Sequence, residues 1–118
     1  MRKVNLYLDD IRSAPDDSWT VVRTAEEARA LLASGRVEYA SLDHDLGECD
    51  ECADAFPPRG YTVVTNTCRH RMTGYDLVKW MAETGTWPAR KPMVHSANPV
   101  GRANMIATIE RYWHPPAP

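Results

Sequence analysis

Acidic and histidine side chains gather at three points of this sequence, each directly after a short and mostly apolar stretch. The three groups are Asp9-Asp10 after residues 4–8, Asp43-His44-Asp45 after residues 37–42, and His95-Ser96 after residues 92–94. Carboxylates are rarely buried without partners, and two that flank a histidine repel each other unless a cation or phosphate chemistry is nearby. Imidazole titrates near neutral pH, which suits acid–base chemistry. These residue types favour one functional site that three chain segments build together.

The elements that position these groups follow from hydrophobic pattern and from turn and cap residues. The predicted strands are residues 3–8, 19–23, 37–43 and 92–95, and the predicted helices begin after the N-cap residues Thr24, Thr73 and Asn98. Asn98 is followed by Pro99, which favours a helix start at this point. Residues 11–18 favour a loop, because turn-forming residues dominate them. Residues 47–72 lack a hydrophobic pattern, and we interpret them as an insertion.

Strands separated by helices indicate an α/β fold, here an open parallel sheet with helices on both faces. Residues 1–118 form a single domain, long enough for a real core. In such sheets, ligands bind beyond the carboxyl ends of the strands, near a change in strand order. We predict the strand order 2-1-3-4, because it brings the three acidic and histidine groups side by side.

Composition excludes several classes of function. Hydrophobic residues make up 43% of the chain and charged residues 25%, as in ordinary soluble domains. The net charge of −2 gives no basis for an extended DNA-binding surface, although it allows a small basic spot for one phosphate. No apolar run approaches the roughly 20 residues of a membrane span, and no apolar signal region follows Met1. We expect a cytoplasmic protein without membrane attachment, and its protein partners stay open.

All three cysteines lie in the insertion, together with a histidine. Cys49-x-x-Cys52 is separated by fifteen residues from Cys68-x-His70, which is the spacing of a tetrahedral Zn²⁺ site. Four protein ligands leave no open position, so we predict a structural zinc that orders the insertion. The alternative is three unrelated free thiols. Metal analysis of protein purified without chelators tests this prediction, which expects about one zinc per chain.

Four ordered motifs resemble a known family. They are Leu8-Asp9-Asp10-x-Arg12-x-x-Pro15, Ser41-Leu42-Asp43-His44-Asp45-Leu46-Gly47, Thr73-Gly74-Tyr75-Asp76 and His95-Ser96-Ala97-Asn98-Pro99-x-Gly101. The acidic pair, the aspartate after a central strand and the Ser-Ala pair resemble response-regulator receiver domains, which have a flavodoxin-like fold. Together the four motifs resemble the receiver-derived cyclic-phosphate processing receiver domains.

The receiver resemblance implies a Mg²⁺ site and a phosphate site. By that resemblance Asp9, Asp10 and Asp43 would hold Mg²⁺, Asp43 would stand at the phospho-acceptor position, and the Ser96 hydroxyl would contact phosphate. Two features differ from receivers: no helix is expected after the first strand, and no fifth strand carries the receiver lysine. His44 and His95 are not receiver features either.

The narrower resemblance implies processing of a 2′,3′-cyclic phosphate on RNA or a nucleotide, linked to RNA repair. Hydrolysis of this group needs a base, an acid and cationic stabilisation of the phosphate. We predict His44 and His95 as base and acid, with Asp43 and Asp45 supporting them. The predicted phosphate contacts are Arg12, Ser96, Asn98 and Arg102, helped by the N-terminus of the helix that begins at Pro99. Alternatively, Mg²⁺ bound by the aspartates does the charge work.

Two other functions stay open. One is a signalling receiver that takes a phosphoryl group on Asp43. The other is a non-catalytic module that binds a phosphorylated ligand.

Overall fold

The computed structural model describes residues 3–46 and 72–115. Within these ranges the chain forms four strands and three helices. They are β1 (Val4–Leu8), β2 (Trp19–Val22), α1 (Ala25–Ala33), β3 (Val37–Leu42), α3 (Gly74–Thr84), β4 (Met93–Val94) and α4 (Pro99–Tyr112). The predicted elements are therefore confirmed, with β4 shorter than the sequence indicates.

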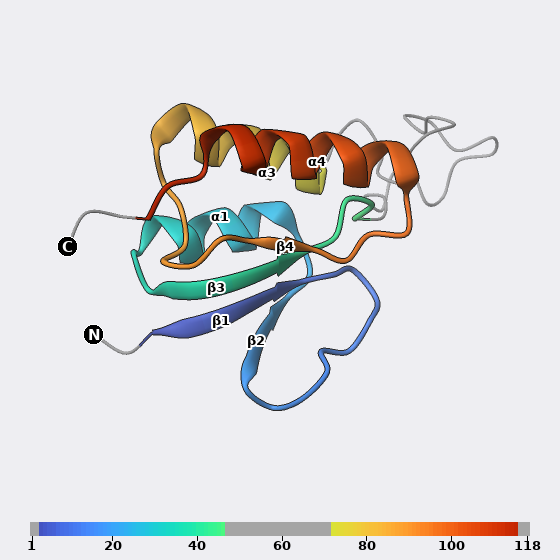
Figure 1. Cartoon of the computed structure of the whole chain (residues 1–118). Coiled ribbons are helices and arrows are strands. Elements are labelled where there is room, and N and C mark those ends of the chain that lie inside the picture. The colour runs from blue at the N-terminus through green and yellow to red at the C-terminus, as the bar shows by residue number, and fades with distance from the viewer. Residues whose placement is uncertain (1–2, 47–71, 116–118) are drawn as a thin grey trace.

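The four strands form one sheet in the order β2-β1-β3-β4, and each neighbouring pair is parallel. This is the predicted order. Because the strands are parallel, the carboxyl ends of β1, β3 and β4 lie along the same edge of the sheet. Figure 1 shows that β1, β3 and β4 end close together. The sheet therefore brings the three acidic and histidine groups, which directly follow these strands, to one edge.

Each helix begins at the N-cap that the sequence predicts. The side chains of Thr24, Thr73 and Asn98 accept hydrogen bonds from the backbone N–H of Glu27, Asp76 and Gly101, respectively. These bonds satisfy N–H groups that the first turn of a helix leaves without partners. None of the helices in the described ranges is long and apolar enough to cross a membrane.

The prediction of helices on both faces of the sheet is wrong for the described residues. All three helices lie on one side of the sheet (Figure 1), where α3 contacts both α1 and α4. The physical reason is the direction of the crossovers. The chain passes from β2 to β3 and from β3 to β4 in the same direction across the sheet, and right-handed crossovers then place α1 and α3 on the same face. The last helix, α4, follows β4 and packs against α3 on that face.

The two faces of the sheet differ in composition. The side that faces the helices contributes Leu6, Leu8, Ala40 and Leu42 to the buried core. The opposite side carries aromatic rings from three strands: Tyr7 lies edge-on to Trp19, which contacts Tyr39. Because side chains two residues apart in a strand share a face, Asp9 lies on the same side of the sheet as Tyr7.

Candidate functional site

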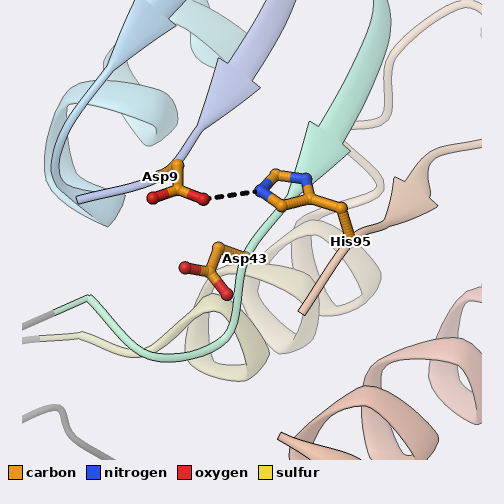
Figure 2. A group of neighbouring side chains, drawn as sticks. All are labelled: Asp9, Asp43 and His95. Carbon is orange, nitrogen blue, oxygen red and sulfur yellow. Dashed lines mark hydrogen bonds and ion pairs between the residues drawn. The ribbon is translucent and has the colours of Figure 1, made fainter. Parts of the chain in front are cut away.

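The site begins one residue beyond the strand ends, where the backbone ladder continues. The N–H of Asp43 donates to the Leu8 carbonyl (3.0 Å), and the N–H of His95 donates to the Leu42 carbonyl (3.0 Å). The first bond holds the chain after β3 in register with β1, and the second holds the chain after β4 in register with β3. As a result Asp9, Asp43 and His95 lie together at one end of the sheet (Figure 2).

Asp9 is fully buried, and several hydrogen-bond donors stabilise its ionised carboxylate. Its Oδ1 accepts hydrogen bonds from the backbone N–H of Ile11 (3.0 Å) and Arg12 (2.8 Å), and its Oδ2 lies 3.0 Å from His95 Nε2. Burial raises the pKa of this carboxyl, but the two backbone donors and His95 outweigh burial and leave the pKa below its usual value. Asp9 is therefore a fixed negative charge of the site.

His95 is held on both ring nitrogens and on one ring face. Nε2 meets Asp9 Oδ2, and Nδ1 lies 2.7 Å from the hydroxyl of Ser41, which is fully buried. The imidazole also stacks on Tyr7, with ring centroids 4.5 Å apart and planes within 5°. Three contacts thus fix the orientation of the ring, and its Nε2 points to the carboxylates.

Asp43 has the opposite electrostatic character to Asp9. It is 8% exposed, and among the described donors Oδ1 accepts only the backbone N–H of His44 (2.8 Å). Burial and the negative charge of Asp9 raise the pKa of this carboxyl above its ordinary value. Within residues 3–46 and 72–115, Oδ2 of Asp43 has no hydrogen-bond partner. The site therefore holds one carboxylate that is stabilised as an anion and one that is not.

A hollow of about 160 Å³ opens beside these side chains. It is lined by Asp9, Asp10, Ile11, Arg12, Asp43, Asp45 and Ala97. Burial, followed by the charges of Asp9 and Asp45, raises the pKa of Asp10 despite a lowering backbone hydrogen bond. Among the residues that the structure describes, Arg12 is the one cationic side chain in this lining. A phosphate would therefore meet mainly negative charge, unless a cation or protons neutralise the carboxylates.

The donor set fits a divalent cation. One ligand atom each of Asp9, Asp43 and His95 lies within 4.8 Å of the others, and two of the three residues are buried. Asp10, the third residue predicted for Mg²⁺, lines the same hollow but is not part of this group. Carboxylate oxygens suit Mg²⁺, whereas an imidazole suits transition metals.

His44 lies apart from His95, on the side of the chain that the helices cover. Its Nδ1 lies 2.9 Å from Asp45 Oδ1, its carbonyl accepts the N–H of Gly74, and its ring packs directly against Gly101 in the first turn of α4. Asn98 Nδ2 donates to the same Asp45 oxygen (3.2 Å). The structure therefore brings His44, Asp45 and Asn98 together as one group and His95, Asp9 and Asp43 as another.

Three predicted phosphate contacts lie around the start of α4: Ser96, the N-cap Asn98 and Arg102. Ser96 is buried, and its hydroxyl accepts the backbone N–H of Asn98 (3.1 Å). Arg102 is exposed and lines a different hollow, between β4 and α4, with Met93 and Ile106. Arg12, by contrast, lies at the acidic hollow and donates to the His95 carbonyl (3.3 Å).

The predicted zinc ligands Cys49, Cys52, Cys68 and His70 lie outside the described residues. Their assignment stays a prediction. The structure also adds two residues that the sequence analysis did not assign to the site, Tyr7 and Ser41. Strand alternation is the signal for them, because Tyr7 precedes Asp9 by two residues and Ser41 precedes Asp43 by two.

The parallel sheet in the order 2-1-3-4, with acidic residues at the ends of β1 and β3, defines a receiver-like domain. Comparison with protein families matches residues 4–111 to the family described as the cyclic-phosphate processing receiver domain. The chain belongs to this family. Comparisons with curated proteins and with solved structures return no match.

Proposed function

We propose that this domain binds a 2′,3′-cyclic phosphate, on an RNA end or a nucleotide, and hydrolyses it at the acidic hollow. The observation that carries the proposal is the convergence of Asp9, Asp43 and His95 at one sheet edge, in a chain of the cyclic-phosphate processing receiver family. Fold alone would not support a reaction, because one fold hosts many functions.

The reaction places defined demands on the site. A water attacks phosphorus, and the bond from phosphorus to the 2′ or the 3′ oxygen breaks. A base takes the proton of the water, and an acid supplies one to the leaving oxygen. Without a cation, burial and the charge of Asp9 raise the pKa of Asp43, which suits this carboxyl for proton transfer. With a cation bound, Asp43 and His95 would hold it instead, and the cation would supply the acidity that activates water.

Phosphate binding falls to Arg12 and to a bound cation. Arg12 is the guanidinium at the hollow, and its planar fork suits phosphate oxygens. A divalent cation held by Asp9 and Asp43, when bound, would neutralise the carboxylates and stabilise charge on the phosphate. His44 supports the reaction indirectly in this proposal: with Asp45 it holds the start of α4 beside the hollow.

³¹P NMR of a nucleoside 2′,3′-cyclic phosphate tests the proposal, with and without divalent cation, beside the same experiment on a short RNA with a cyclic phosphate end. We expect conversion to a monoester, reduced about 100-fold or more in Asp43→Asn and His95→Ala. His114→Ala is the matched histidine control, because His114 is exposed and contacts only its neighbour Pro115 among the described residues. No conversion of either substrate would overturn hydrolysis, and binding without turnover would leave a phosphate-binding module.

A phospho-acceptor receiver is the second candidate function. The observation in its favour is the position of Asp43, directly after the central strand β3 and next to Asp9. Incubation with acetyl phosphate and Mg²⁺, followed by intact-mass analysis, would show an added phosphoryl group that Asp43→Asn lacks. An unchanged mass in the wild-type chain would exclude this function.

A further inference from the structure

We infer that His95 is a metal ligand beside Asp9 and Asp43, so that the site takes a divalent metal that accepts imidazole, such as Mn²⁺, Fe²⁺, Co²⁺ or Zn²⁺, in preference to Mg²⁺. The inference rests on the cation of the proposed function and names its chemical class. It also assigns Ser41 as the residue that positions the ligand nitrogen.

The first observation is the spacing of the donor atoms. Neighbouring ligands of a metal bound at about 2.1 Å lie about 3 Å apart. His95 Nε2 and Asp9 Oδ2 are 3.0 Å apart, and one ligand atom each of Asp9, Asp43 and His95 lies within 4.8 Å of the others. Two of the three donors therefore already have the separation of neighbouring ligands, and Figure 2 shows the Asp43 carboxylate beside them.

The second observation is the carboxylate of Asp43. This side chain is 8% exposed, and its Oδ2 has no hydrogen-bond partner in the part of the chain that the structure describes. A buried carboxylate oxygen without a donor is costly. A cation between Asp9 and Asp43 would remove this cost, because it would give the Asp43 oxygen a partner.

The third observation is the support behind the ring. Histidine ligands of metals regularly bond through their other nitrogen to a neighbouring group, which fixes the tautomer. Ser41 takes this position, 2.7 Å from Nδ1 and fully buried, while Tyr7 holds the ring plane by stacking. A hydroxyl both donates and accepts, so Ser41 serves either tautomer.

Metal binding through Nε2 defines the tautomer of the ring. A ligating Nε2 carries no proton, so any proton on this nitrogen leaves to solvent when the metal binds. Nδ1 then carries the N–H and donates to the Ser41 oxygen, which lies 2.7 Å away.

The imidazole decides which metals are favoured. Mg²⁺ demands oxygen ligands and retains its waters, whereas transition metals accept imidazole readily. A site of three carboxylates alone would lack this preference. The His95 ring therefore distinguishes this site from the all-aspartate Mg²⁺ site that the receiver resemblance implies.

Competition of Mn²⁺ with Mg²⁺ tests the inference, with free Mn²⁺ followed by electron paramagnetic resonance. Mn²⁺ is a suitable probe because soft thiolates such as those of the predicted zinc site do not select it. The variants are His95→Phe, which keeps a ring to stack on Tyr7 but has no nitrogen, and Ser41→Ala. His114→Asn is the control, because its imidazole lies outside the site.

We expect the wild-type chain to bind Mn²⁺ at least about tenfold more tightly than Mg²⁺. His95→Phe should lose this preference and retain its weak Mg²⁺ binding, and Ser41→Ala should weaken Mn²⁺ binding about 10- to 100-fold. Equal binding of the two metals by the wild-type chain, or an unchanged preference in His95→Phe, would overturn the inference. Circular dichroism confirms that each variant is folded.

Nitrogen-15 NMR of the histidines provides a readout that is independent of turnover. A diamagnetic metal such as Zn²⁺ should shift the His95 Nε2 signal to that of a metal-bound nitrogen, with the proton on Nδ1, and leave His114 unchanged. A metal that binds without changing the His95 signals would overturn the role of this residue. Because neither measurement uses a substrate, a metal site without phosphate hydrolysis would refute the proposed function while the present inference stands.

Discussion

The two histidines at the carboxyl edge of the sheet have similar partners and different surroundings. Each has an aspartate oxygen on one ring nitrogen, Asp9 for His95 and Asp45 for His44. The His95 ring lies on an aromatic residue of the sheet, with a second carboxylate beside it. The His44 ring lies against a glycine of α4, under a helix.

The difference follows from strand alternation and from the one-sided placement of the helices. Residues 43 and 44 point to opposite sides of the sheet, and only one of these sides is covered in the described structure (Figure 1). His44 thus becomes a packing residue that joins β3 to two helices, whereas Asp43 and His95 remain beside the hollow. A histidine with a carboxylate partner is therefore not by itself a sign of catalysis.

The largest expected effect comes from Gly74→Ala. A Cβ at this position would approach the Asp43 carbonyl more closely than real Cβ atoms do, and a backbone atom cannot move aside cheaply. We expect a loss of about 3 kcal/mol in the free energy of unfolding, measured by urea denaturation. Because the conflict lies at Asp43 itself, Mn²⁺ binding should weaken as well. A variant as stable as the wild type would show that α3 is not held this closely to β3.

Gly101→Ala should separate the two histidine groups. Its Cβ would meet the His44 ring, which can turn away only by breaking its bond to Asp45. We expect a loss of about 1–2 kcal/mol in the free energy of unfolding, with Mn²⁺ affinity unchanged. The matched double variant His44→Ala/Gly101→Ala tests the cause, because the second change should cost less once the ring is gone. Strictly additive losses would refute the contact.

Asn98→Ala should have a smaller effect on the same group. It removes the helix cap to Gly101 and the bond to Asp45, and loss of a cap costs about 1 kcal/mol. Asn98→Ser is the informative partner, because serine restores a cap acceptor but has no amide to donate to Asp45. The NMR signals of His44 should move in both variants, while thermal stability should recover in the serine variant alone. Thr24→Ala, at the cap of α1, is the control that leaves His44 unchanged.

Much of the scaffold could be predicted from the sequence, because local signals determine it. The caps at Thr73 and Asn98 act over three residues, and the strand order followed from requiring the polar strand ends to meet. The faces of the sheet could not be predicted in the same way, because the side on which a helix packs depends on the direction of the crossovers. The expectation of helices on both faces failed for this reason.

The sequence predicted which acidic residues converge at the site, but only part of the arrangement of the histidines around them. Asp9, Asp43 and His95 converge as the strand order requires. The pairing of His44 with His95 as base and acid stays a hypothesis that the geometry does not favour. The β3–β4 register, continued by one residue, places Asp43 opposite His95, and His44 lies one residue further along. Because side chains alternate, the two imidazole rings lie on opposite sides of the sheet. Ser41 opens one of the four motifs, but the sequence assigned it no role. Strand alternation places it on the face of Asp43, and its 2.7 Å contact with His95 shows what it does there.

The smallest expected effects are on the pH dependence of the free energy of unfolding. They distinguish Asp9 from Asp43, the two carboxylates beside His95. Asp9 has a lowered pKa in the folded state, so its ionised form stabilises the fold above the unfolded pKa of about 3.9, and this stabilisation is lost as pH falls through the folded pKa. Asp43 has a raised pKa, so stability falls as pH rises from the unfolded value through the folded one. The two residues should therefore respond to neutralisation with opposite signs.

Asp9→Asn and Asp43→Asn provide the matched test, with urea denaturation at about pH 3.5 and pH 7 in buffer without added divalent cations. Relative to the wild type, Asp9→Asn should be less stable at neutral pH, and this deficit should shrink in acid. Asp43→Asn should gain relative stability on going from acid to neutral pH, because it removes a buried charge that the wild type must carry there. Parallel pH profiles for both variants would refute the assignment of one stabilised and one unstabilised anion. Added Mn²⁺ should stabilise the wild-type chain at neutral pH more than either variant, because each variant lacks one ligand of the inferred site.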